Sequence, residues 1–160
     1  MSRIISFNLN GNPVEVMSGD AETLLEVLRG GLGLTSPKCG CNQGDCGACT
    51  IILDGNAVKA CTVLAPTVEG KFVRTLDGLV REGELHPVQK AFHEYGAPQC
   101  GYCASGMVMA AVAFLEHNPS PTEDEVYEAL SGNLCRCGAY KKYAMATLAA
   151  AKGEFGPLMP

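Results

Sequence analysis

The alternation of hydrophobic and polar positions in the first part of the chain predicts strands around a single helix. Residues 3–9 alternate between apolar and polar side chains, as a strand with one buried face does. Asn10-Gly11 is a favoured pair for a type I′ turn, and residues 13–17 form the predicted returning strand. A helix is predicted over residues 21–29, where leucines gather on one face and Asp20 can cap the first turn.

Short apolar stretches between turn residues predict further strands. Residues 51–53 and 57–63 flank Asp54-Gly55 and form a second predicted hairpin, and residues 72–75 form a last short strand. The order strand, strand, helix, loop and strands is that of a β-grasp unit of the plant-type ferredoxin kind. We assign this unit to residues 1–78.

The pattern becomes helical beyond residue 78. Pro87 suits the first position of a helix, and the sequence from Thr122 to Glu125 has the form of a capping box. We therefore predict an α+β protein in which a small helical bundle, residues 79–160, follows the ferredoxin-like unit. The predicted helices cover residues 87–95, 106–117, 122–130 and 140–151, and a loose tail follows over residues 153–160.

Four of the nine cysteines lie within residues 38–50, in the loop between the predicted helix and the second hairpin. Cys41, Cys46 and Cys49 have C-x4-C-x2-C spacing, and Cys61 follows after eleven intervening residues. This is the ligand spacing of a plant-type 2Fe–2S cluster, with three thiolates from one loop and the fourth from farther along. Glycines between the cysteines allow the tight turns that direct backbone N–H groups at cluster sulfurs. Cys39 is a possible alternative ligand, but the spacing is complete without it, so it is predicted to be a small buried or loop thiol.

A second group of cysteines lies in the predicted helical half. Cys100 and Cys103 form a C-x2-C pair, and Cys135 and Cys137 form a C-x-C pair, with thirty-one residues between the two pairs. Two interpretations are open at this point: a second redox cluster or a structural zinc site. A zinc site prefers two C-x2-C pairs, and a first cluster loop is present in the same chain, so we favour the cluster.

Composition and charge exclude several classes of function. The net charge of −5 argues against nucleic acid as a partner, and the longest apolar run, residues 108–115, is too short to span a membrane. Nine cysteines without a visible export signal indicate a reducing compartment, so a cytoplasmic location is predicted. The sequence shows no arrangement of catalytic side chains that would act on a substrate.

Three motifs together resemble the small iron–sulfur subunit of the molybdenum hydroxylases, the family of xanthine dehydrogenase, aldehyde oxidoreductase and carbon monoxide dehydrogenase. The resemblance covers nearly the whole chain. The motifs are Lys38-x-Gly40-Cys41-x2-Gly44-x-Cys46-Gly47-Ala48-Cys49-Thr50, Gln99-Cys100-Gly101-Tyr102-Cys103 and Gly132-Asn133-Leu134-Cys135-Arg136-Cys137.

The resemblance implies two 2Fe–2S clusters, one in each half, and a large partner subunit that carries a molybdopterin cofactor. It also implies that Gln99 and Cys137 lie beside that pterin. Ala104-Ser105 and Gly138-Ala139 depart from the commoner family residues and look more like the isoquinoline oxidoreductase branch, which uses a cytochrome acceptor. The acceptor is therefore either a flavin (FAD) subunit or a haem-containing cytochrome.

The predicted function is that of an electron-transfer subunit in an oxidoreductase complex. A molybdenum centre that hydroxylates a substrate gains two electrons, and each 2Fe–2S cluster accepts one, so two clusters let the pair leave stepwise. We expect electrons to enter at the helical-half cluster and to leave from the ferredoxin-like one. The alternatives are a free-standing ferredoxin-type carrier and a zinc-bound interaction module.

Overall fold

The computed structural model describes residues 2–158 as an α+β protein with a mixed sheet and a group of helices, so the predicted class is confirmed. The sheet has five strands in the order β2-β1-β5-β3-β4. β1 and β5 run parallel, and the other neighbours are antiparallel. The strands are β1 (Ser2–Leu9), β2 (Asn12–Gly19), β3 (Thr50–Leu53), β4 (Asn56–Lys59) and β5 (Phe72–Arg74).

Both predicted hairpins are present, and the backbone angles of their turns explain the residues found there. Asn10 and Gly11 have φ values of 54° and 88°, and Asp54 and Gly55 have φ values of 47° and 84°. A type I′ turn needs positive φ at both central residues, which Asn, Asp and Gly adopt at the lowest cost. These turns pair β1 with β2 and β3 with β4.

Two local predictions in this half were wrong. The helix begins later than predicted, because Thr23 rather than Asp20 is the N-cap of α1 (Leu24–Glu26). The Thr23 hydroxyl accepts the Glu26 N–H, and the Glu26 carboxylate accepts the Thr23 N–H at 2.7 Å. Each side chain thus provides an acceptor for the backbone N–H of the other residue. The chain then widens into a single π-helical turn, η1 (Val27–Gly31).

The second error concerns the fourth cysteine of the first group. β4 ends at Lys59, and Cys61 lies in a 3-10 turn, η2 (Ala60–Thr62), rather than in a strand. Side chains in a 3-10 turn repeat every three residues and not every two, so Cys61 does not follow the alternation of β4. Two further 3-10 turns follow before the helices, η3 (Ala65–Val68) and η4 (Leu76–Gly78).

The second half contains the four predicted helices. They are α2 (Pro87–Glu94), α3 (Ala104–His117), α4 (Glu123–Leu130) and α5 (Tyr140–Ala151). α3 starts directly after Cys103, earlier than the sequence pattern indicated. The predicted tail is partly packed, because the Phe155 ring stands edge-on to Tyr95 at 6.4 Å; residues 159 and 160 of that tail lie outside the described residues.

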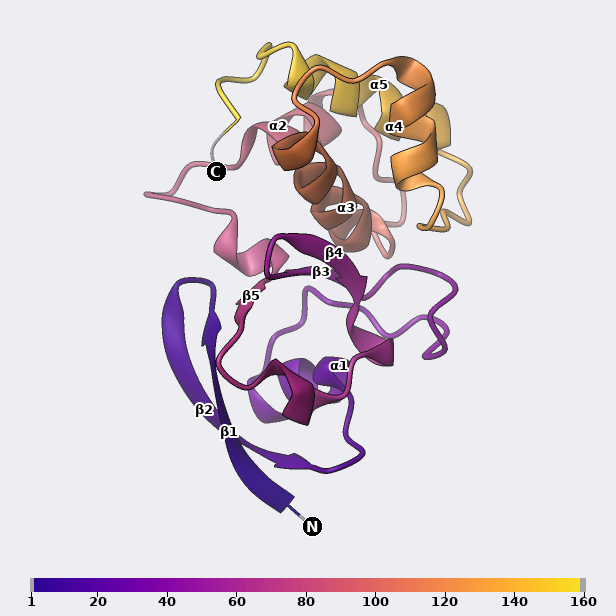
Figure 1. The fold of residues 1–160 in the computed structure, drawn as a ribbon. Helices are drawn as coiled ribbons and strands as arrows, with labels where there is room; N and C mark the ends of the chain where they lie inside the picture. The colour runs from indigo at the N-terminus through magenta and orange to yellow at the C-terminus, as the bar shows by residue number, and fades with distance from the viewer. Residues whose placement is uncertain (1, 159–160) are drawn as a thin grey trace.

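The sheet with α1 forms one part of the molecule and the four later helices form the other, with α3 lying across the β3–β4 hairpin between them (Figure 1). Each part has its own buried apolar cluster. Ile52 of β3 belongs to the helical cluster, so the two cores meet under α3. Within residues 2–158, none of the helices has the length and apolar character needed to cross a membrane.

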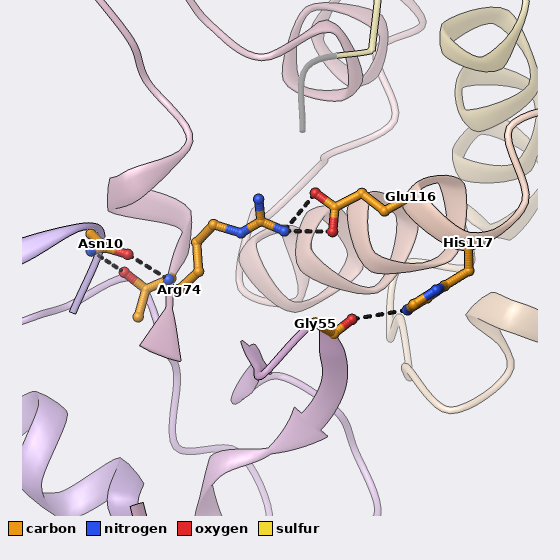
Figure 2. A network of polar contacts seen from close by, with 6 residues as sticks. Asn10, Gly55, Arg74, Glu116 and His117 are labelled. Atoms are coloured by element: carbon orange, nitrogen blue, oxygen red, sulfur yellow. Dashed lines mark hydrogen bonds and ion pairs between the residues drawn. The ribbon is translucent and has the colours of Figure 1, made fainter. Parts of the chain in front are cut away.

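Polar contacts join the two parts along one side of α3 (Figure 2). The Arg74 guanidinium of β5 donates to both carboxylate oxygens of Glu116 at 2.5 and 2.6 Å. The neighbouring His117 lies with Nε2 3.1 Å from the Gly55 carbonyl oxygen in the β3–β4 turn. The end of α3 is therefore held against both β5 and the β3–β4 turn.

Candidate metal centres

The loop that carries the first cysteine group directs backbone donors at one sulfur. Cys41 Sγ accepts the N–H groups of Asp45 and Cys46 at 3.3 Å each and of Gln43 at 3.5 Å. Such a cluster of N–H groups favours an anionic sulfur. The N–H groups of Cys46 and Gln43 are the main reason that the pKa of Cys41 falls to about 6.

Two glycines in this loop leave room that any side chain would fill. A Cβ at Gly40 would lie 2.7 Å from Cys46 Sγ, and a Cβ at Gly44, where φ is +90°, would lie 2.9 Å from Thr62 Cγ2. Thr62 follows Cys61 in the chain, so the Gly44 turn packs directly against the segment that supplies the fourth cysteine. The tertiary fold thus closes the loop on Cys61 across the sequence gap.

Two further thiols of the first group, Cys49 and Cys61, are buried, whereas Cys46 is half-buried. Cys49 and Cys61 are 2% and 6% exposed, and Cys61 is one of the groups that act on the pKa of Cys49. Burial, with a smaller contribution from Cys61 and Cys46, raises the pKa of Cys49 to about 11. A buried thiol of this kind ionises when a cation compensates the charge, which iron would do.

The second group is assembled from two separate segments of the helical half, one before α3 and one between α4 and α5. Cys103 precedes α3, and Cys135 lies between α4 and α5; both are buried, and Cys135 is one of the groups that act on the pKa of Cys103. Burial raises the pKa of Cys103. Burial acts to raise the pKa of Cys135 as well. The backbone N–H of Ala139 and, to a smaller extent, the Cys103 side chain act in the opposite direction, and the pKa of Cys135 is lowered overall. Cys100 and Cys137 are exposed.

The thiol pairs fit a two-iron cluster. Among residues 2–158, no three His, Cys, Asp or Glu side chains are grouped as ligands of one ion. The described cysteines instead influence one another's ionisation, since Cys61 acts on the pKa of Cys49 and Cys135 acts on that of Cys103. A 2Fe–2S cluster takes two protein ligands on each iron, so paired thiolates and converging N–H donors are what it requires.

The two cysteine groups touch through their backbones. The Leu134 N–H donates to the Cys46 carbonyl oxygen at 2.8 Å, which links a residue of the first group to the neighbour of Cys135. Beside it, Asn133 Nδ2 donates to the Gly47 carbonyl oxygen at 2.9 Å and to Thr50 Oγ1 at 3.2 Å. Both groups therefore share one rigid contact between the halves of the molecule.

Other residues singled out by the sequence lie at the surface. Gln99 and Cys137 are both exposed. Cys39 is exposed as well, and its carbonyl oxygen accepts the Tyr102 hydroxyl at 2.7 Å. The sequence analysis missed Tyr143, whose hydroxyl lies 3.6 Å from Cys103 Sγ; its distance of forty residues along the chain from Cys103 left no local signal.

Comparison with known proteins assigns a cluster-binding family to each half. The model of a 2Fe-2S iron-sulfur cluster binding domain matches residues 7–75, and that of a second 2Fe-2S binding domain matches residues 75–148. A nicotinate dehydrogenase subunit of Pseudomonas putida is 43% identical over 98% of this chain and 100% of its own length. The nicotine 6-hydroxylase small subunit of Paenarthrobacter nicotinovorans is 47% identical over 95% of this chain and 91% of its own.

The chain belongs to the iron–sulfur subunit family of the molybdenum hydroxylases. Its fold agrees with a chain of quinoline 2-oxidoreductase from Pseudomonas putida, with a TM-score of 0.91, 40% identity and 95% of both chains covered. Aldehyde oxidoreductase from Desulfovibrio desulfuricans gives a TM-score of 0.91 at 37% identity, where 99% of this chain matches 19% of that one.

Family membership confirms the main functional prediction. The chain is an electron-transfer subunit of an oxidoreductase complex and carries two 2Fe–2S clusters, one for each matched domain. This function is favoured over the free-standing ferredoxin and the zinc module, because the relatives that match almost end to end are named as subunits of dehydrogenases and hydroxylases.

Proposed function

We propose that the chain takes electrons from a large subunit that binds molybdopterin, and that it passes them singly through its two clusters to a flavin or cytochrome acceptor. In this proposal residues 1–78 are a β-grasp unit for the first cluster and residues 79–160 a helical unit for the second. The nine thiols, all free of disulfides, support work in the reducing cytoplasm.

The proposed ligands follow from the cysteine groups. The first cluster is bound by Cys41, Cys46, Cys49 and Cys61, whose loop has its N–H donors directed at sulfur. The second is bound by Cys100, Cys103, Cys135 and Cys137, from the segments around α3 and α5. Each set would hold two irons through four thiolates, so the loaded chain contains about four irons.

The exposure of the second cysteine group supports the proposed direction of electron transfer, from the second cluster to the first. In the second group Cys100 and Cys137 reach the surface, and the apolar side chains of Tyr102 and Leu134 beside them are 51% and 55% exposed. An exposed apolar surface at a redox site is typical of a docking face for a partner. We infer that the pterin-bearing subunit binds here, with Gln99 and Cys137 nearest the pterin, and that electrons enter at the second cluster.

The observation that carries the proposal is the hydrogen bond from the Leu134 N–H to the Cys46 carbonyl. It joins the peptide next to Cys135 with a residue of the other cysteine group at 2.8 Å. This contact provides a short bonded connection between the two sites, with no solvent-filled gap at that point. The first cluster would then deliver the electrons to the acceptor.

Rapid-freeze electron paramagnetic resonance of the assembled complex tests this order. With substrate added, Cys46→Ser should still show reduction of the second cluster while turnover with the acceptor stops. Cys135→Ser should block reduction of the first cluster by substrate. The proposed order is wrong if the Cys46→Ser complex, with its second cluster intact, shows no substrate-driven reduction of that cluster.

A further inference from the structure

A buried tyrosine hydroxyl lies beside the second cysteine group. Tyr143, in the first turn of α5, is only 1% exposed, and its hydroxyl oxygen is 3.6 Å from Cys103 Sγ. Since a buried hydroxyl needs a hydrogen-bond partner, the sulfur is more than a neighbour in van der Waals contact.

The packing around Tyr143 fixes its ring. Phe92 of α2 stands edge-on to it, with ring centroids 5.0 Å apart and planes at 62°. Phe92 is itself 2% exposed and belongs to the same apolar cluster. The phenol therefore cannot swing away from Cys103 without opening the core between α2 and α5.

The direction of the hydrogen bond follows from the chemistry of an iron ligand. A cysteine bound to iron is a thiolate and has no proton, so in the loaded protein the Tyr143 O–H is the donor and Cys103 Sγ the acceptor. Reduction adds one negative charge to the cluster and increases the charge on its sulfurs. A donor to such a sulfur stabilises the reduced form more than the oxidised form.

We propose that Tyr143 is a positioning residue for the second cluster, whose hydroxyl raises the reduction potential of that cluster by donating to Cys103 Sγ. The inference rests on the proposed assignment of Cys103 as a ligand. It gives the second cluster a greater tendency to accept an electron than its thiolate set alone would provide. The effect concerns this chain alone and does not depend on which substrate the complex oxidises.

The test is an anaerobic redox titration of the complex, with both clusters followed by electron paramagnetic resonance. Tyr143→Phe keeps the ring and removes the hydroxyl. We expect the ratio of reduced to oxidised second cluster at a fixed potential to fall about tenfold, which corresponds to about 59 mV for one electron. The first cluster serves as the internal control, and Tyr95→Phe, whose ring contacts Phe155 instead, should leave both potentials unchanged.

A second variant keeps the test decisive if Tyr143→Phe loads iron poorly. A 3,5-difluorotyrosine placed at position 143 keeps the hydroxyl and makes it a stronger donor, so the second potential should rise rather than fall. The proposal is overturned if an iron-loaded variant leaves the second potential unchanged, or if both substitutions shift it in the same direction. The titration uses a chemical reductant, so its result does not depend on the order in which substrate reduces the two clusters. The ligand assignment is tested separately: a Cys103→Ser variant that keeps all its iron would reject Cys103 as a ligand.

Discussion

Asn133 and Gly47 come from opposite halves of the chain and are joined by a buried hydrogen bond of 2.9 Å between Asn133 Nδ2 and the Gly47 carbonyl oxygen. The Gly47 oxygen also accepts the N–H and the hydroxyl of Thr50 at 3.0 and 2.7 Å. Gly106 of α3 lies so close to the same carbonyl that a Cβ on it would clash. One backbone oxygen in the first cysteine loop thus anchors the contact between the two proposed clusters.

Gly47→Ala should be far more damaging than Gly55→Ala. Both glycines have positive φ, +70° and +84°, so each alanine costs about 1 kcal/mol in backbone strain. Only at Gly47 would the new Cβ also meet other atoms, 2.5 Å from the Gly132 oxygen and 2.7 Å from Asn133 Nδ2. We expect Gly47→Ala to lose first-cluster iron and to unfold at lower denaturant concentration. Equal denaturation midpoints for the two variants would contradict this account.

The ion pair between Arg74 and Glu116 should contribute measurably to the attachment of α3 to the sheet. Both side chains are 23% exposed, and the guanidinium contacts both carboxylate oxygens. A double-mutant cycle with Arg74→Met and Glu116→Gln should give a coupling free energy of about 1 kcal/mol. The pair Lys90–Glu84, whose side chains are 36% and 73% exposed, is the matched control and should give less. Larger coupling in the control pair would reject the assignment.

Cys39→Ser should leave both clusters in place, whereas Cys46→Ser should remove the first. Cys39 is exposed, and the contact it makes to the second half uses its carbonyl, which serine retains. Cys46 belongs to the ferredoxin spacing, and losing its cluster should destabilise a half of only about eighty residues. Iron analysis and visible absorbance of the two variants check this. Comparable iron loss in the Cys39 variant would show that the ligand set is wrong.

The capping box at the start of α4 should make part of the stability depend on pH. The N–H and the hydroxyl of Thr122 both donate hydrogen bonds to the Glu125 carboxylate. They lower the pKa of Glu125 below its ordinary value of 4.5, and the N–H has the larger effect. Because the folded pKa is the lower one, this stabilisation is complete above about pH 4.5 and is lost as the pH falls through the folded pKa.

Chemical denaturation at about pH 7 and at acidic pH tests this dependence. The difference in unfolding free energy between the unsubstituted protein and Glu125→Gln should shrink as the pH falls. Taking this difference cancels the contribution of the clusters. Glu123→Gln, in the same turn but outside the capping box, is the control. A difference that stays constant with pH would refute the capping role of the charge.

The sequence by itself determined the features that depend on neighbours along the chain. Strand alternation, the Asn10-Gly11 turn and the Thr122 capping box were predictable, because each is settled by a few consecutive residues. The cysteine spacing predicted the cluster type for the same reason, since three ligands of the first group share one short loop. The Thr23 cap is also a local feature, because Thr23-Leu24-Leu25-Glu26 has the form of a capping box, and the prediction of Asp20 overlooked it.

Tertiary structure alone decided which distant residues meet at the sites. Cys61 lies in a 3-10 turn that the Gly44 turn, distant in the sequence, contacts at Thr62. The contact of Asn133 with Gly47 spans 86 residues, and that of Tyr143 with Cys103 spans 40. No local propensity specifies such pairs, because they form only when burial of the apolar faces of α3 and α5 brings the segments together. The surroundings that tune each cluster are therefore a property of the packed core.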